Sequence, residues 1–294
     1  MILSKRSFLS RWPIDSYFAI SLGLLALISA LVLLLILGFL WREAWPVLSE
    51  GGWRGFLFDQ GWYPLEHQFG ILPMVWASLA AAVGAIAIAT PLGIACAIFE
   101  RFSAKPAVAT SFRALLALLA GIPSVVYGLW GLTVLVPLIA MWQAPGASLL
   151  AAMLILALMI LPTVAITCSS ALASVPANLL QGAAALGLSE RGTILKVAIP
   201  TAKSGIVSGI LLALARALGE TMAVLMVAGN VVQTPSSLFD SVRVLTANIA
   251  LEMAYAVDQH RAGLFASGLL LTLVVLVLAW LGNRIEHQQA LVRG

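Results

Sequence analysis

Residues 148–172 read SLLAAMLILALMILPTVAITCSSAL, a run of 25 residues without a charged side chain. The hydrocarbon core of a bilayer is about 30 Å thick, and an α-helix needs roughly 20 apolar residues to cross it. This run is therefore long enough and apolar enough to form a transmembrane helix.

The rest of the chain repeats this pattern. Six candidate spans lie at about residues 17–40, 72–99, 114–141, 148–172, 204–230 and 262–282. Hydrophobic residues make up 62% of the 294 residues and charged residues 10%. A soluble domain has roughly 45–50% apolar and about 25% charged residues. The sequence thus predicts an all-α integral membrane protein, a single bundle of six transmembrane helices.

The positions of lysine and arginine predict the orientation. One side of the predicted bundle holds only Arg42, Arg54, Arg243 and Arg261. The other side holds Lys5, Arg6, Arg11, Arg101, Lys105, Arg113, Arg191, Lys196, Lys203, Arg284 and Arg293. Basic loops stay in the cytoplasm. We therefore expect a bacterial inner-membrane protein with 1–16 and 284–294 cytoplasmic, 41–71 periplasmic, and 72–283 as a five-helix core.

The first span could be mistaken for a signal peptide, because basic residues precede it. Its apolar run is longer than the roughly 7–15 residues of a signal-peptide core, and bulky Trp41 follows it instead of a small-residue cleavage site. We interpret 17–40 as a retained membrane anchor.

A net charge of +4 raises the question of a nucleic-acid partner. The basic residues form short clusters between apolar spans, which fits membrane topology and contact with lipid, not nucleic-acid binding. Cys96 and Cys168 fall inside spans without metal-binding spacing, and His67, His260 and His287 are far apart. No metal site is expected.

The segment 173–203, between the fourth and fifth spans, carries helix start and stop signals. Asn178 is a good N-cap, Gly187 can end a helix in a left-handed conformation, and Ser189 can cap a second helix. Pro200 is expected to stop that helix before the fifth span. The pattern predicts a compact cytoplasmic helix–turn–helix. A structured connector, or an interfacial helix on lipid, fits the same residues.

Residues 181–200, QGAAALGLSERGTILKVAIP, resemble the EAA loop of bacterial ABC importer permeases. That loop typically reads Glu-Ala-Ala, three residues, Gly, nine residues, Ile-x-Leu-Pro. Gly187 and Pro200 match directly and Ala183 matches in place, while Gln181 and Gly182 depart from Glu and Ala. The resemblance implies that these five residues couple the chain to a cytoplasmic ATPase.

Further stretches are similar to Pst-type phosphate permeases. They are GIPSVVYG at 121–128 and RALGETMAV at 216–224, with FGILP at 69–73 and LTANIALEM at 245–253 looking more like the PstC subunit than its sister PstA. The resemblance implies a phosphate-import function. It also implies three partners: a second, PstA-like permease subunit, a cytoplasmic ATPase dimer and a periplasmic phosphate-binding protein.

Arg216 and Glu220 are charged residues well inside a predicted span. A charge at the bilayer centre costs about 2.5–3.5 kcal/mol on insertion scales. Their spacing of four residues places both on one helix face, where they could form a structural ion pair. The Pst resemblance favours a substrate path, in which Arg216 binds the anion and Glu220 partly neutralises it while the site is empty.

Other candidate path residues lie nearby. Thr221 could add a hydroxyl, although a bond back to its own helix is the simpler expectation. Pro123 interrupts the third span, either as a packing kink or as a break that exposes Ser124 and Tyr127 to the path.

Asn248 and Glu252 lie four residues apart in the loop between the fifth and sixth spans. They fit a short helix that dips back toward the bundle. A solvated connector is the slightly favoured interpretation.

No GxxxxGK[ST] phosphate loop and no hydrolytic triad is present in the sequence. The chain is therefore predicted to be no enzyme and to hold no cofactor itself, with ATP and Mg²⁺ bound by the partner ATPase. Molybdate or sulfate are alternative cargoes. A non-transporting scaffold and a stand-alone secondary transporter are the alternatives of other classes.

Overall fold

The computed structural model describes residues 13–293, and the surroundings of side chains within 18–49 and 51–285. Some predictions fall outside these ranges, namely those on Lys5, Arg6, Arg11, His287, Arg293 and most of segment 1–16.

The described chain is almost entirely helical. Five helices contain a stretch long and apolar enough to cross a membrane: α1 (Pro13–Glu50), α3 (Leu72–Ile98), α7 (Leu149–Ala173), α10 (Ile199–Gly219) and α13 (Asp258–Arg293). A sixth crossing exists if the bent pair of α4 (Pro106–Gly121) and the segment Ser124–Ala140 is one span. The prediction of an all-α membrane bundle is confirmed.

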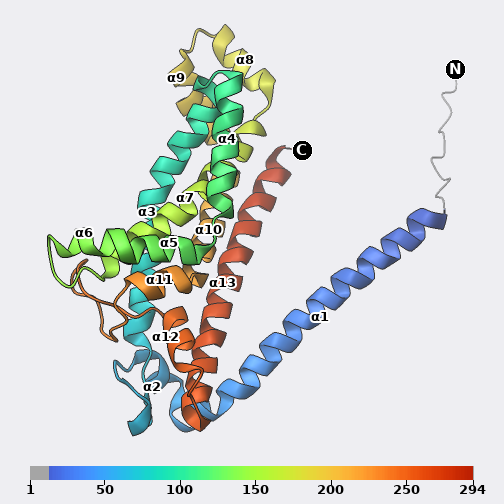
Figure 1. The fold of residues 1–294 in the computed structure, drawn as a ribbon. Helices are drawn as coiled ribbons and strands as arrows, with labels where there is room; N and C mark the ends of the chain where they lie inside the picture. Colours follow the sequence, from blue (N-terminus) through green and yellow to red (C-terminus); the bar gives the residue numbers. More distant parts are fainter. Residues whose placement is uncertain (1–12, 294) are drawn as a thin grey trace.

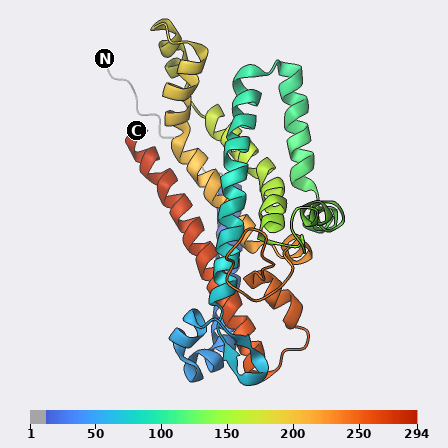
Figure 2. The ribbon, with the colours of Figure 1, turned by 90° about the vertical axis from the view of Figure 1, so that its left-hand side faces the viewer.

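The centre of the bundle is the contact between α3 and α7 (Figure 1), and α3 runs between α4 and α13 (Figure 2). Small residues recur every fourth position along α3, and all are buried: Ala77, Ala81, Ala85, Ala89, Gly93 and Ala97. A Cβ atom at Gly93 would lie 2.7 Å from Val164 of α7. Helices in a membrane associate through such close backbone approach.

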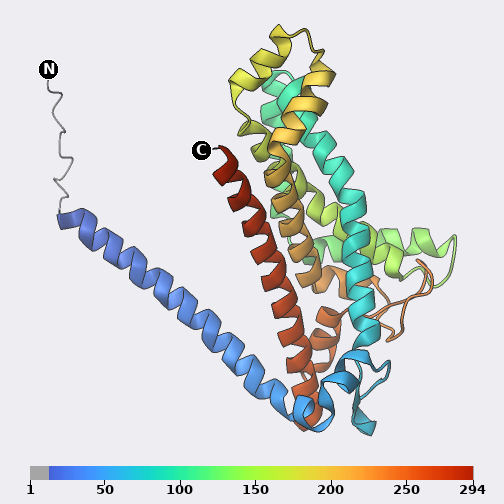
Figure 3. The ribbon, with the colours of Figure 1, turned by 180° about the vertical axis from the view of Figure 1, so that it is seen from behind.

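Helix α1 lies apart from the bundle for most of its length, and the C-terminal part of α1 contacts the N-terminal part of α13 (Figures 1 and 3). Phe39 packs edge-on against Phe265 there, with ring centroids 5.5 Å apart. The helix continues to Glu50, so the predicted loop 41–71 begins as helix. The reason is that Ala44, Val47 and Leu48 are buried in a small core of their own.

The rest of 41–71 contains α2 (Gly52–Phe58), a 3-10 turn η1 (Pro64–Glu66), and the antiparallel strands β1 (Trp62–Tyr63) and β2 (Gln68–Phe69). With α12 (Leu245–Glu252), these elements form one end of the molecule, which we call the α12 end (Figure 1). The opposite end, the α8 end, carries α8 (Ala177–Ala185) and α9 (Glu190–Thr193). Helix α1 begins and α13 ends on the side nearer the α8 end.

The predicted third span, 114–141, is interrupted at Pro123, as the sequence indicates. α4 and the following segment meet at an angle of 87°. After the bend the chain continues as α5 (Ser124–Trp130), a π-helical turn η3 (Gly131–Leu135) and α6 (Val136–Ala140). The predicted fifth span, 204–230, is also broken, because α10 ends at Gly219 and α11 (Met222–Val227) follows.

Helix α12 is not a solvated connector. Thr246, Asn248 and Glu252 are all buried, so the helix dips back onto the bundle. The slightly favoured interpretation of this loop was therefore wrong, because the polar side chains find partners inside the protein.

Candidate substrate-path site

The break between α10 and α11 is built around Glu220. Its backbone is extended (φ −72°, ψ 127°), which ends α10. Its carboxylate Oε1 accepts a hydrogen bond from the Ala223 amide at 3.1 Å, and so caps α11. Its carbonyl accepts a hydrogen bond from the Thr246 hydroxyl of α12 at 2.8 Å. Glu220 is thus held by the start of α11 and by α12.

Arg216 lies one turn earlier on α10, and its side chain is exposed in the isolated chain. Its Nη1 donates a long, 3.4 Å hydrogen bond to the Thr163 hydroxyl of α7. Within the described residues, no carboxylate comes within the 4.0 Å ion-pair distance of this guanidinium. The predicted Arg216–Glu220 ion pair is wrong, because the helix break turns Glu220 toward Ala223.

This arrangement leaves most of the Arg216 donors for another group. A guanidinium has five N–H donors in a fixed planar geometry and remains charged. Arg216 lies in a helix long and apolar enough to cross a membrane, and a charge facing lipid there would be energetically costly.

The bend between α4 and α5 follows from Pro123. The Leu119 carbonyl would accept a hydrogen bond from the amide of residue 123 in a continuous helix, but proline has no N–H. The Tyr127 hydroxyl donates to this carbonyl at 2.8 Å, and the Ile122 amide does so at 3.3 Å. The predicted path residue Tyr127 therefore uses its donor inside the bend.

The two breaks meet because α5 packs against α11. A Cβ atom at Gly128 would lie 2.9 Å from the Ala223 Cα, so only glycine permits this approach. The predicted residue Ser124 lies in the first turn of α5, and Thr221 lies at the start of α11. Both residues are half-buried.

The Thr221 hydroxyl donates a 3.4 Å hydrogen bond back to the Gly219 carbonyl at the end of α10. The bond is local, as expected, but it joins Thr221 to the preceding helix across the break and not to its own helix. Of the five predicted path residues, Arg216 is the one cation, and the described chain uses one of its several N–H donors.

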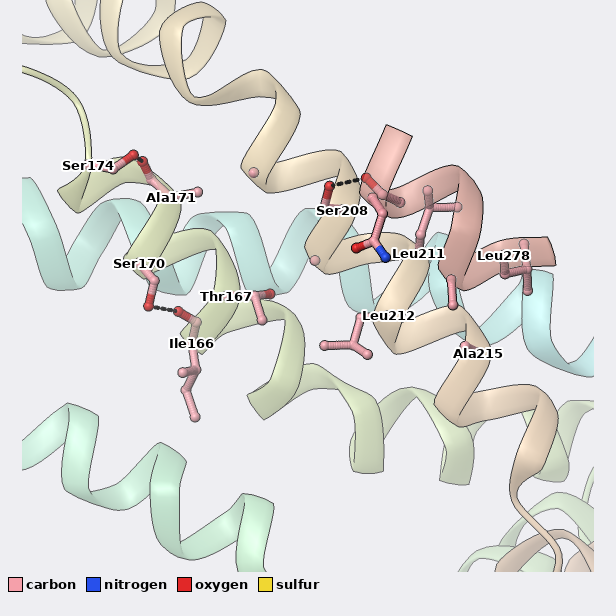
Figure 4. Close-up of a pocket in the computed structure, with 15 residues that line it drawn as sticks. Ile166, Thr167, Ser170, Ala171, Ser174, Ser208, Leu211, Leu212, Ala215 and Leu278 are labelled. Carbon is pink, nitrogen blue, oxygen red and sulfur yellow. Dashed lines mark hydrogen bonds between the residues drawn. The ribbon is translucent and has the colours of Figure 1, made fainter. Parts of the chain in front are cut away.

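A pocket of about 560 Å³ lies between α7, α10 and α13 (Figure 4). It extends from Leu212 and Ala215, next to Arg216, toward the C-terminal ends of α7 and α13. Its hydroxyl groups already donate to backbone carbonyls, Ser170 to Ile166 at 3.0 Å and Ser208 to Gly282 at 3.1 Å. The pocket is therefore not a preformed anion site.

The predicted coupling residues lie on α8 and the turn after it. Gln181 and Gly182 are exposed, whereas Ala183 is buried. Gly187 has φ +79°, and the amides of Gly187 and Leu188 donate to the carbonyls of Ala184 and Ala183. This is a Schellman C-cap, in which glycine meets no Cβ penalty.

Pro200 does not stop a helix, which corrects the prediction for this residue. Helical structure runs from Glu190 to Gly219, and Pro200 is the second residue of α10. A π-helical turn, η4 (Ile194–Ala198), precedes it. Such a turn changes the hydrogen-bond pattern just where proline lacks an N–H, so the helix can continue.

Sequence reasoning missed several partners of these residues. Thr163, Leu119 and Thr246 come from segments distant along the chain, and no local pattern indicates their contacts. The buried Glu100, at the π-helical turn η2 (Phe99–Ser103), was also missed; it binds the Arg113 Nη2 at 2.5 Å and ties α3 to α4. A buried carboxylate near the end of a span is the signal that could have indicated this pair.

Comparison with known proteins decides the family. The model of the binding-protein-dependent transport system inner membrane component family matches residues 89–289, which is more than half of the chain. The chain belongs to this family.

Relatives cover most of the permease. It is 32% identical to the phosphate transport system permease protein PstC of Haemophilus influenzae, over 95% of this chain and 96% of that protein. It is 34% identical to the PstC of Mesorhizobium japonicum, over 85% and 84%. It is 39% identical to the probable ABC transporter permease protein YqgH of Bacillus subtilis, over 78% and 77%.

The fold of the permease is similar to that of a solved transporter. The MetNI methionine ABC transporter in an inward-facing conformation matches with a TM-score of 0.58 and 19% identity, covering 73% of this chain and 94% of that chain. At this identity the likeness concerns the fold alone. The family and the PstC relatives, not this fold match, show a permease subunit of an ABC importer.

Proposed function

We propose that this permease is one of the two membrane-spanning subunits of an ATP-driven phosphate importer in a bacterial inner membrane. The observation that carries the proposal is the unneutralised guanidinium of Arg216, placed where two broken spans meet. The PstC relatives support phosphate as the cargo.

The chemistry of Arg216 fits a tetrahedral oxyanion. A planar guanidinium binds phosphate oxygens with two parallel, charge-assisted hydrogen bonds. The α10–α11 break keeps Glu220 turned away, so the anion does not compete with a carboxylate for the same donors. A single cation also allows release, because a carrier must not bind its cargo too tightly to let it go.

The exposed position of Arg216 requires a partner. We propose that a second, PstA-like permease subunit covers this face, and that the two subunits enclose an aqueous path. A single chain would leave the guanidinium open to lipid, which is energetically unfavourable.

The α8 end is proposed to be cytoplasmic, with both termini, and to dock on an ATPase dimer that binds ATP and Mg²⁺. Leu186 and Leu195 beside α8 and α9 are 83% and 64% exposed, an apolar surface suited to burial by a partner. Gln181 replaces the acidic residue typical of the family, so this contact is proposed to depend on shape and apolar area. A periplasmic phosphate-binding protein would dock on the α12 end.

In this mechanism the ATPase moves α8 and α9, and α9 is continuous with α10 through η4. A displacement of the loop therefore reaches Arg216 along one helix. Phosphate would enter from the α12 end, contact Arg216 and leave toward the α8 end.

Purified importer in liposomes, with its ATPase and binding protein, tests the proposal. We expect ATP-dependent uptake of labelled phosphate that excess molybdate or sulfate does not suppress. Competition by one of those anions at equal concentration would instead identify a different oxyanion. Purification of the chain without any ATPase subunit would favour a membrane scaffold.

A further inference from the structure

The Glu220 carbonyl has an unusual partner. In a continuous helix it would accept a hydrogen bond from the Val224 amide. The break removes that donor, and the Thr246 hydroxyl takes its place at 2.8 Å. Thr246 is 7% exposed and lies 26 residues further along the chain, so the contact is tertiary.

Helix α12, which carries Thr246, is itself fixed at its start. The Leu245 amide donates to the Ser78 hydroxyl of α3 at 2.9 Å, and this hydroxyl donates to the Met74 carbonyl at 2.8 Å. Ser78, Glu220 and Thr246 line one small cavity, so three polar groups from three segments meet directly behind the break.

The other end of α12 is fixed by charge. Arg243 Nη1 donates to Glu252 Oε1 at 2.6 Å and to Asn248 Oδ1 at 3.1 Å. Glu252 Oε2 also accepts from the Trp62 indole at 2.7 Å and pairs with His260 at 2.8 Å. These groups join β1, α12 and the start of α13, so α12 has little freedom to shift.

Two conformations compete at residues 219–222. A continuous helix would restore the backbone bond to Val224 and would place Glu220 on the same face as Arg216, four residues away. The broken form keeps Glu220 away from Arg216 but needs a donor for the freed carbonyl, because an unpaired buried carbonyl is costly. Thr246 is the donor that favours the broken form.

We propose that Thr246 is a positioning residue for transport: it holds the α10–α11 break open and so keeps Arg216 unpaired for the anion. This inference rests on the proposed function. It assigns a role to the α12 end that concerns the path itself, in addition to any contact with an external protein.

Substitutions at Thr246 test the inference in the complete importer. Thr246→Val keeps the shape but removes the hydroxyl, and Thr246→Ser keeps it. Thr272→Val is the matched control, because the Thr272 hydroxyl bonds the Gly268 carbonyl of its own helix. We expect Thr246→Val to lower the maximal rate of phosphate uptake about fivefold with little change in KM, as loss of one hydrogen bond would.

The serine variant is expected to restore uptake, and the Thr272→Val control to leave it unchanged. Normal uptake by Thr246→Val would overturn the inference. Failure of Thr246→Ser to recover any uptake above that of the valine variant would also overturn it, because the hydroxyl would then not be the active group.

A second readout separates this inference from the choice of cargo. The chain has two cysteines, Cys96 and Cys168, which can be replaced by alanine so that Met222→Cys becomes a single label site at the start of α11. We expect Thr246→Val to change the rate of maleimide labelling at this position about fivefold, whichever anion is carried. An unchanged rate would overturn the inference even if phosphate uptake is confirmed.

Discussion

The two broken spans of this permease differ in which residues donate hydrogen bonds to the backbone carbonyls that each break frees. At the α4–α5 bend, the Leu119 carbonyl is bonded by Tyr127, four residues beyond the proline in the same span. At the α10–α11 break, the Glu220 carbonyl is bonded by Thr246 from α12. The freed carbonyl of the first break is bonded by a residue of the same span, whereas the freed carbonyl of the second is bonded by a residue of another helix.

We propose that this difference separates a break that is structural only from one that serves transport. A locally satisfied bend is stable by itself and shapes the bundle. A break that depends on the Thr246 hydroxyl of α12 can change when that hydroxyl is lost, and it lies one helical turn from Arg216. We therefore expect substitutions at the α4–α5 bend to affect stability, and those at the α10–α11 break to affect transport.

The largest expected effect belongs to Arg216→Ala. Loss of a charge-assisted contact to the anion costs roughly 1.5–3 kcal/mol, which corresponds to about 10–150-fold in uptake rate. The measurement is phosphate uptake per assembled importer. Arg284→Ala is the control, because that guanidinium lies over Trp280 near the end of α13, 4.9 Å from the ring centroid. Equal uptake by both variants would remove Arg216 from the path.

Glu220 provides the next test, because its carboxylate caps α11. Glu220→Gln retains an oxygen that can accept from the Ala223 amide, so uptake should stay close to that of the parent. Glu220→Ala removes the cap, which costs about 1 kcal/mol, and should lower uptake severalfold. If Gln is as harmful as Ala, the negative charge itself matters and the capping account is wrong.

Tyr127→Phe tests the other break. It leaves the Leu119 carbonyl with the weaker contact from Ile122, and we expect a loss of about 1 kcal/mol in stability. Thermal unfolding of the purified protein measures this. Uptake per folded importer should be unchanged, and a large loss of uptake at full stability would mean that Tyr127 contacts the cargo.

The smallest effect is expected at Asp240, which is remote from both breaks. Hydrogen bonds from the Ser236 hydroxyl and from the amides of Ser236 and Ser237 lower the pKa of its carboxyl. Because the folded pKa is depressed, the associated stability is present above the ordinary aspartate pKa and is lost as pH falls through the lowered value. Unfolding of the parent and of Asp240→Asn should differ slightly at neutral pH and converge in acid. A constant difference across pH would contradict this.

Much of the architecture could be predicted from the sequence. The uninterrupted apolar run at 148–172 became α7, and Gly187 occupies the left-handed C-cap that its position indicated. These features depend on short stretches of chain, so local physical rules are sufficient for them.

The break between α10 and α11 could not be located in this way, whereas Pro123 indicated the interruption of the third span. Residues 204–230 read as one apolar helix, and no proline lies near Glu220 to mark an interruption. The break exists because a hydroxyl from residue 246 and a side-chain cap on Ala223 replace helical bonds. The same tertiary bond separates Glu220 from Arg216, which is why an ion pair that looks favourable from the spacing does not form.

The prediction for Asn248 and Glu252 was wrong for a related reason. Charged and polar residues in a loop usually face water. Here Arg243, nine residues before Glu252, supplies the compensating charge and allows both side chains to be buried. A sequence shows the charges but not which of them will meet.

The most direct test of the central claim compares Arg216→Lys with Arg216→Gln in the reconstituted importer, at equal amounts of assembled complex. If an unpaired positive charge at this position binds the anion, the lysine variant should retain uptake on the order of a tenth of the parent rate. Lysine keeps the charge but cannot form the two parallel hydrogen bonds of a guanidinium. Glutamine, which carries no charge, should lower uptake well below that of the lysine variant. Equal uptake by the two variants would show that the charge of Arg216 does not carry the anion.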